Sequence, residues 1–163
     1  MTDDDLPLHE VSTRDYQPAD AATLADVYRA AILQTACAAY NAEQCAAWAA
    51  SIDDAAAWAS RLQDAWVRVA VDDEGEIAGF GAIVMPGHID LLFTAPEFNR
   101  QGVASLVLED LLSLAAAMGT KKITTTASEL SRPFFEKHGF RLVESAAHER
   151  CGQSLTCHSL VRG

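Results

Sequence analysis

Basic residues are scarce in this sequence. Lysine and arginine number 12 among 163 residues, against 23 aspartate and glutamate residues, and the formal net charge at pH 7 is −11. Nucleic acids select proteins with basic faces, so this balance argues against a nucleic-acid partner. An acidic surface suits a cationic amine as a ligand, and it equally suits a protein that is simply soluble or salt-tolerant.

The sequence also lacks an apolar run long enough to cross a membrane. The first residues, Met1 to Asp5, are mostly acidic, and no apolar segment follows them. We therefore expect no signal peptide, no membrane partner and a cytoplasmic location. The length is typical of one domain, so we expect residues 1–163 to fold as a single unit, with residues 1–7 as a flexible tail.

The four cysteines form no CxxC pair, and none has a histidine at zinc-finger spacing. The sequence therefore predicts no metal site, and we expect buried, reduced thiols rather than metal ligands or disulfides. Cys151 precedes Gly152 in an expected hairpin, and it is the cysteine that we expect to be reactive if any is.

What the sequence does contain is a strand, a tight loop and a long helix in succession. A short, mostly apolar run, Ile89 to Thr94, ends before Pro96, which has no backbone N–H to donate to a sheet. Apolar residues then recur at the three-and-four spacing of one helix face from Val103 to Met118, and Gly119 supplies a left-handed stop.

The loop between this strand and this helix has small residues at Gly102 and Ala104. A helix N-terminus offers unpaired N–H groups and a partial positive charge, so it can hold a pyrophosphate, to which Arg100 would add a full charge. An ordinary strand-to-helix turn with a capping glycine explains the same residues. The loop alone does not decide between the two interpretations.

Two blocks of the sequence together resemble the GNAT N-acetyltransferase superfamily. Residues 99–104, preceded by a proline and an aromatic residue, are similar to its acetyl-CoA loop, [Arg/Gln]-x-x-Gly-x-[Gly/Ala]. Ala127 to Phe140 is similar to its later segment, which closes on an aromatic-Glu-Lys-x-Gly-Phe signature. The likeness is strongest over residues 66–140 and extends more loosely from Val11 to Val161.

The resemblance implies acetyl-CoA as co-substrate and direct acetyl transfer to an amine of a small molecule or peptide. Asn99 departs from the family pattern, and Phe135 stands where many members carry a tyrosine acid. A non-catalytic acyl-CoA-binding regulatory module is therefore the alternative. Some members of the superfamily form homodimers through their terminal strands, so the resemblance leaves a homodimer open for this chain as well. The implied cofactor-binding residues are Leu92, Phe93, Thr94, Asn99, Arg100, Gln101, Gly102, Val103, Ala104, Ser105 and Phe135.

Periodicity and turn residues predict the remaining elements. A strand reached through a helix should lie parallel to the preceding one, so the sheet is expected to be mixed, with helices on both faces. The resemblance implies the same α/β (α+β) class, a mostly antiparallel sheet with two central parallel strands. Predicted strands are 8–16, 66–71, 76–85, 89–94, 122–127, 140–146 and 155–161. Predicted helices start at Pro18, Asn41, Ser51 (as a cap), Val103 and just before Pro133.

Two titratable residues on the strand before the loop are candidate bases. Strand alternation puts His88, Asp90, Leu92 and Thr94 on one face, and a histidine beside a carboxylate suits proton removal from an amine. Several family members place their base at these positions, and Asp90 lies deeper in the strand than His88. Solvated residues at a strand start are the alternative. A backbone N–H between Leu92 and Thr94 would hold the oxyanion if this strand splays from its parallel neighbour.

The acid that protonates the leaving thiolate has no obvious candidate, because Phe135 cannot donate a proton. Ser128, Tyr40 or water would do so, although a serine at position 128 can equally cap the following helix. The resemblance implies that Tyr40 and Trp48 shape the acceptor site. Composition alone favours core positions for both.

Overall fold

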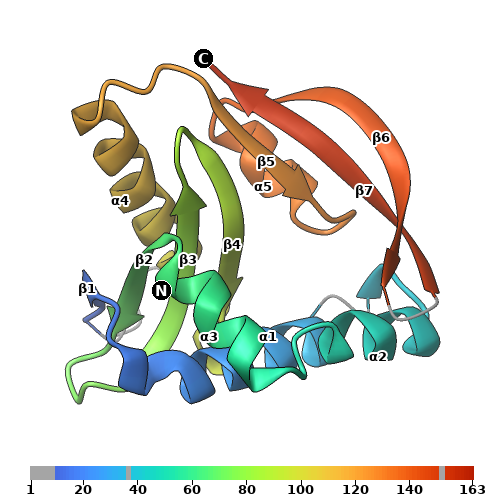
Figure 1. Cartoon of the computed structure of the whole chain (residues 1–163), viewed down its shortest axis with the longest axis horizontal. Coiled ribbons are helices and arrows are strands. Elements are labelled where there is room, and N and C mark those ends of the chain that lie inside the picture. The colour runs from blue at the N-terminus through green and yellow to red at the C-terminus, as the bar shows by residue number, and fades with distance from the viewer. Residues whose placement is uncertain (1–9, 36–37, 151–152) are drawn as a thin grey trace, which may run out of the picture.

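The computed structural model describes residues 10–35, 38–150 and 153–163. These residues form a seven-stranded sheet in the order β1-β2-β3-β4-β5-β7-β6 (Figure 1). The strands are β1 (Ser12–Asp15), β2 (Trp66–Val71), β3 (Ile77–Val84), β4 (His88–Thr94), β5 (Ile123–Ala127), β6 (Arg141–Arg150) and β7 (Gln153–Arg162). The helices are α1 (Ala21–Gln34), α2 (Ala42–Ala50), α3 (Ala55–Gln63), α4 (Val103–Ala117) and α5 (Arg132–Lys137), with 3-10 turns η2 (Pro18–Asp20) and η4 (Pro96–Phe98).

Every neighbouring pair in the sheet is antiparallel except β4 and β5. The register between β4 and β5 has two residue pairs, His88 with Thr124 and Ile89 with Thr125. After these pairs the two strands diverge toward the edge that carries α1 and α2 (Figure 1). The predicted mixed sheet with a central parallel pair is confirmed, and the condition set for an oxyanion donor, that β4 splays from β5, is met.

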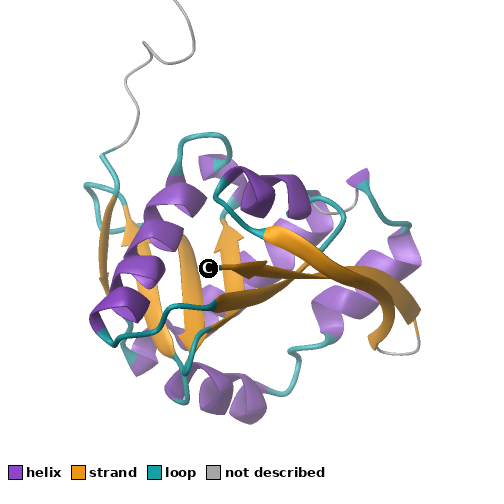
Figure 2. Ribbon diagram, turned by 90° about the horizontal axis from the view of Figure 1, so that it is seen from above, coloured by secondary structure: helices purple, strands orange, loops and turns teal. Residues whose placement is uncertain are grey.

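Small residues on β3 bring α4 close to one face of the sheet. A Cβ built at Gly81 would lie 2.7 Å from Cγ1 of Val107 and 2.9 Å from Cδ1 of Leu111, both on α4. On the opposite face, the Phe80 ring meets Trp58 of α3 edge to face, with 6.2 Å between ring centroids. Helices therefore flank the strands on both sides (Figure 2).

A β-bulge in β4 interrupts the alternation of its side chains. Leu91 pairs with Ala82, whereas Ile89 pairs with the next β3 residue, Ile83. Asp90 is therefore an extra residue on β4 with no partner of its own in this register. A bulge of this kind bends the strand and re-aims the side chains on either side of it.

The bulge changes which residues of β4 share a face. Leu92 Cδ1 lies 3.1 Å from the position of a Cβ at Gly81, on the α4 face. The carboxylate of Asp90 instead contacts Arg61 of α3, on the opposite face. The prediction of one common face for His88, Asp90, Leu92 and Thr94 is therefore wrong, because strict alternation does not hold across a bulge.

The start of α3 differs from the prediction. Asp54, not Ser51, is its N-cap, and the Asp54 carboxylate accepts a hydrogen bond of 3.0 Å from the Ala57 N–H. Ser51 lies at the C-terminal end of α2, where its Oγ donates to the Trp48 carbonyl at 2.6 Å. Both residue types cap helices, so their local preference alone could not separate them.

Other local signals hold. Gly119 and Gly139 follow α4 and α5 with φ of +80° and +91°, and Pro133 lies in the first turn of α5. The expected tail at residues 1–7, the start of the first predicted strand and the expectation for Cys151 lie outside the described residues.

In the part that the structure describes, no helix is long and apolar enough to span a membrane, and no cluster of metal-ligating side chains occurs.

Candidate active site between β4 and β5

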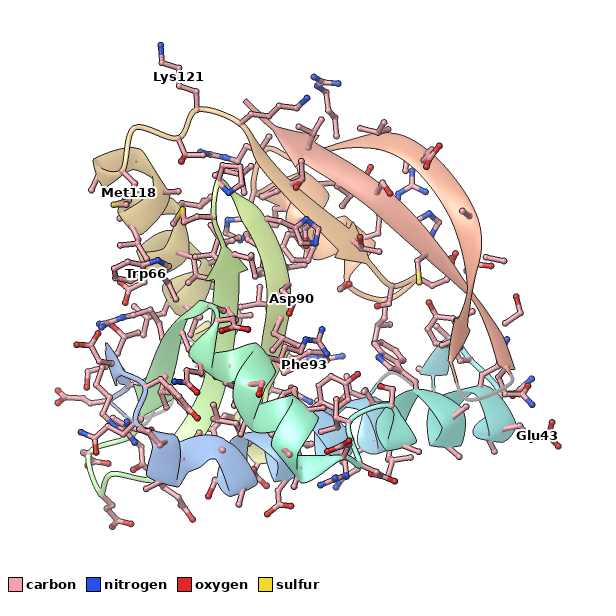
Figure 3. The ribbon with its side chains drawn as sticks, viewed as in Figure 1. Glu43, Trp66, Asp90, Phe93, Met118 and Lys121 are labelled. Atoms are coloured by element: carbon pink, nitrogen blue, oxygen red, sulfur yellow. The ribbon has the colours of Figure 1, made fainter. Side chains whose placement is uncertain are left out.

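Two pockets adjoin where β4 and β5 diverge. The first, of about 220 Å³, extends toward α5 and the C-terminal end of α1. The second, of about 410 Å³, extends toward α2, α3 and β7. Figure 3 places Asp90 and Phe93 along the part of β4 that has left β5. Residues that line both pockets are Trp48, Ile89, Asp90, Leu91, Phe93, Thr126 and Ser128.

The splay leaves backbone donors of β4 directed at the gap. The Ala95 N–H donates to the Ala78 carbonyl of β3 at 2.8 Å. In an extended strand the N–H groups of successive residues point to opposite edges, so those of Thr94 and Leu92 point away from β3, toward the gap. Both residues line the first pocket. Donors in this position can hold a carbonyl oxygen on which negative charge develops.

The predicted cofactor loop has an unusual backbone. Gly102 has φ of +80° and is the N-cap of α4, and Arg100 also has a positive φ, of 63°. A positive φ in a residue other than glycine is uncommon and costs conformational energy. The first helical hydrogen bond runs from the Leu106 N–H to the Gly102 carbonyl, at 3.0 Å. The N–H groups of residues 103–105 therefore form the open first turn of α4.

Polar side chains of this loop and of the first turn of α4 are held by neighbouring elements. Their contacts tie the start of α4 to α1 and α5, so the loop presents its backbone and Arg100 rather than these side chains. The hydrogen bonds join Asn99 Nδ2 to Thr35 Oγ1 (3.1 Å), Gln101 Nε2 to the Glu97 carbonyl (3.4 Å) and Ser105 Oγ to His138 Nε2 (3.2 Å). Asn99 also lines the first pocket, at its loop end.

Asp90, in the second pocket, is bound by an arginine. Arg61 Nε donates to Asp90 Oδ2 at 2.7 Å, and Arg61 Nη2 donates to Oδ1 at 2.9 Å. The hydrogen bond from Arg61 to Asp90 is the main cause that raises the pKa of Arg61 above its ordinary value. Both carboxylate oxygens of Asp90 thus accept hydrogen bonds from the guanidinium of Arg61, so each oxygen already has a partner.

His88 keeps one ring nitrogen available. Its Nδ1 lies 2.8 Å from Thr124 Oγ1 on β5, and the hydroxyl can serve as donor or acceptor. Within the described residues we find no hydrogen bond at Nε2. When Nδ1 carries the proton and donates to Thr124, Nε2 is an unprotonated acceptor in the second pocket.

Ser128 both caps a turn and lines the gap. The Ser131 N–H donates to Ser128 Oγ at 3.1 Å, the Ser128 N–H donates to Ser131 Oγ at 3.0 Å, and the two hydroxyl oxygens are 3.0 Å apart. These bonds close the turn that precedes α5, whose N-cap is Ser131, so Ser128 caps this turn and is not the helix cap that the capping interpretation predicted. Ser128 also lines both pockets, and Ser131 and Phe135 line the first.

Tyr40 and Trp48 form a wall of the second pocket. Their rings pack edge to face with 5.8 Å between centroids. The Tyr40 hydroxyl donates to the Thr156 carbonyl at 2.9 Å and accepts from the Glu129 N–H at 2.8 Å. Burial is the main cause that raises the pKa of Tyr40. A hydroxyl held in this way is better suited to fixing the wall than to supplying a proton.

Sequence reasoning missed three polar residues of the site, namely Arg61, Thr124 and Ser131. Arg61 lies on the amphipathic helix α3, 29 residues from its partner Asp90, and no local pattern signals their contact. A signal for Thr124 did exist, because the predicted parallel pairing of its strand with β4 brings the two strands side by side, and Thr124 pairs with His88.

Comparisons with known proteins agree with this architecture. Residues 36–156 match the family described as "Acetyltransferase (GNAT) domain". The uncharacterized N-acetyltransferase YafP of Escherichia coli K12 is 32% identical over 149 residues, which are 91% of this chain and 93% of YafP.

Solved structures show the same likeness. A GCN5-related N-acetyltransferase from Rhodopseudomonas palustris has a TM-score of 0.91 and 30% identity, with 96% of this chain and 98% of that one covered. The PaiA N-acetyltransferase of Thermoplasma acidophilum, solved with coenzyme A, shares the fold with a TM-score of 0.76 and 16% identity, over 94% and 98% of the chains. The chain therefore belongs to the GNAT acetyltransferase family and is an acyltransferase.

Proposed function

We propose that this protein transfers the acetyl group of acetyl-CoA to an amine of a small molecule or peptide, directly and within a ternary complex. The observation that carries the proposal is the meeting of two pockets at the gap between β4 and β5. Two substrates that enter from opposite sides can place their reacting atoms in contact there. The coenzyme A bound to the Thermoplasma acidophilum protein of the same fold supports the choice of cofactor.

The first pocket and the adjoining loop receive acetyl-CoA in this proposal. The open N–H groups of residues 103–105 and the charge of Arg100 bind the pyrophosphate, which is the group that a helix N-terminus favours. The thioester lies along β4, where the N–H of Leu92 or Thr94 donates a hydrogen bond to its carbonyl oxygen. Phe135 contributes an apolar wall to this pocket.

The reaction needs one proton acceptor and one proton donor. The amine nitrogen attacks the thioester carbonyl carbon, negative charge moves to the oxygen, and the carbon–sulfur bond then breaks to release the thiolate. His88 Nε2 takes the proton that the amine loses, while Nδ1 is held by Thr124. Ser128 gives a proton to the thiolate and regains one through Ser131 or water. Asp90 remains the alternative base.

A panel of amines tests the proposal. The measurement is thiol release from acetyl-CoA, together with mass spectrometry of the amine product. We expect thiol release that depends on the amine and equals the amount of acetylated product. Binding of acetyl-CoA without product from any amine would instead support the non-catalytic acyl-CoA-binding module.

A further inference from the structure

We propose that the acceptor is a small zwitterion, an amine that also carries a carboxylate as an amino acid does, and that Arg61 binds this carboxylate. The inference rests on the proposed acetyl transfer and names the acceptor class. Among the described residues that line the second pocket, Arg61 is the only lysine or arginine and Asp90 is the only carboxylate. The pocket thus contains one positive and one negative side chain, which are paired with each other.

Asp90 orients the guanidinium of Arg61 but does not occupy all of its N–H donors. It has five N–H donors in a planar fork, and the two contacts with Asp90 involve Nε and Nη2. In the described part of the chain we find no hydrogen bond from Nη1. The Arg61 side chain is 39% exposed, and its guanidinium carbon lies 6.0 Å from the centroid of the Trp58 ring. Its second edge can therefore bind a carboxylate without first being ordered.

Charge favours a zwitterion over a simple anion or a simple cation. A ligand with net negative charge is repelled by a protein of net charge −11. A plain cation would meet the guanidinium of Arg61 in the same pocket and leave its open edge without a partner. A zwitterion places its carboxylate on Arg61 and its ammonium near Asp90 and His88, where the proton must be lost.

The remaining walls indicate the size and polarity of the acceptor. The second pocket, of about 410 Å³, has a volume typical of small-molecule sites. Trp48, Phe93 and Leu155 provide apolar surface beside the polar groups. An amino acid whose side chain packs on these three residues matches the volume, and the larger, polar share of the lining faces its amine and carboxylate.

Matched acceptors test the inference. The measurement is kcat/KM for phenylalanine, for phenylalanine amide and for phenethylamine, which differ in the carboxylate but keep the amine and the ring. We expect phenylalanine to be preferred by about tenfold or more, which corresponds to about 1.4 kcal/mol. Equal or better turnover of the two analogues that lack the carboxylate would overturn the zwitterion and leave acetyl transfer standing. Failure of every amine would contradict the proposed function itself.

Two variants locate the determinant. Arg61→Lys keeps a cation beside Asp90 but loses the fork, so we expect KM for phenylalanine to rise and the preference to fall close to one, with KM for acetyl-CoA unchanged. Arg29→Lys is the matched control, because Arg29 pairs with Asp53 at 3.1 Å and lines neither pocket. A rise in the melting temperature on adding acetyl-CoA shows that each variant is folded and binds the cofactor. A full preference retained in Arg61→Lys would overturn the assignment.

Discussion

His88 and Asp90 lie two residues apart on β4, yet their side chains have different partners. Asp90 accepts two hydrogen bonds from Arg61, at 2.7 and 2.9 Å, and is 24% exposed. His88 contacts Thr124 through Nδ1, and within the described residues its Nε2 has no hydrogen-bond partner. At the scale of single residues, the partners rather than the residue types therefore favour His88 as the base.

Replacing His88 tests this role. We expect His88→Gln to lower kcat by about 100-fold or more, because general-base catalysis contributes on that order. KM for acetyl-CoA should stay unchanged, since His88 does not line the first pocket. Steady-state kinetics measure both. A larger loss in Asp90→Asn than in His88→Gln would reverse the assignment.

A second prediction at this scale concerns stability at low pH. Hydrogen bonds from Arg14 to Asp20, at 2.8 and 3.0 Å, are the main cause that lowers the pKa of Asp20. A carboxyl whose pKa is lower in the folded state stabilises the fold above its unfolded pKa, and this contribution is lost as pH falls through the folded pKa.

We therefore expect the free energy of unfolding to fall more steeply between about pH 5 and about pH 2 in the wild type than in Asp20→Asn. Urea unfolding at a series of pH values measures the difference. Asp26→Asn, with a side chain 81% exposed, is the control and should retain the wild-type pH dependence. Identical slopes in Asp20→Asn and the wild type would contradict the prediction.

At the scale of elements, the close approach of α4 to β3 sets the position of the cofactor loop. The loop leads into α4, and α4 packs on β3 where Gly79 and Gly81 have no side chains. A Cβ at Gly79 would lie 2.7 Å from the Phe93 carbonyl oxygen and 2.8 Å from Val103 Cγ1. A larger residue at either glycine would therefore displace the helix that begins at the loop.

Gly81→Ala tests this packing. Its Cβ would meet Val107 and Leu111 at less than van der Waals distance, so we expect a loss of about 1–3 kcal/mol in the free energy of unfolding. Val107→Ala removes one of the contacted methyl groups, and the double variant should lose less than the sum of the two single variants. Strictly additive losses in urea unfolding would show that the two positions do not clash.

At the scale of the whole molecule, the sheet is two halves joined by a short parallel contact. One half holds β1 to β4 and the other holds β5, β7 and β6, and the junction has two residue pairs. Below the junction the two halves separate (Figure 1). Residues of both halves line both pockets. A cofactor bound in the gap would contact both halves, so its binding should stabilise the fold as a whole.

Thermal unfolding measures this stabilisation. Acetyl-CoA at about 100 times its dissociation constant is expected to add about 2.7 kcal/mol to the free energy of unfolding, and free CoA should act similarly. ATP, which lacks the pantetheine arm, is the control and should shift the melting temperature much less. No rise with acetyl-CoA or CoA would mean that residues 99–104 are only a turn.

Local signals were enough to predict most elements and the family. The apolar period from Val103 to Met118, the stops at Gly119 and Gly139 and the proline in the first turn of α5 each act within a few residues, so they can be read without knowledge of the fold. The two blocks that resemble GNAT proteins are also continuous in sequence, and the family match confirms that interpretation.

Tertiary structure decided the arrangement of the reactive groups. The bulge at Asp90 exists only through pairing with β3, so alternation alone assigned Leu92 to the wrong face. The contact between Arg61 and Asp90 joins residues 29 positions apart, and α3 delivers the arginine to the pocket. Side-chain partners of this kind depend on how helices and strands pack against each other, and local sequence patterns do not predict that packing.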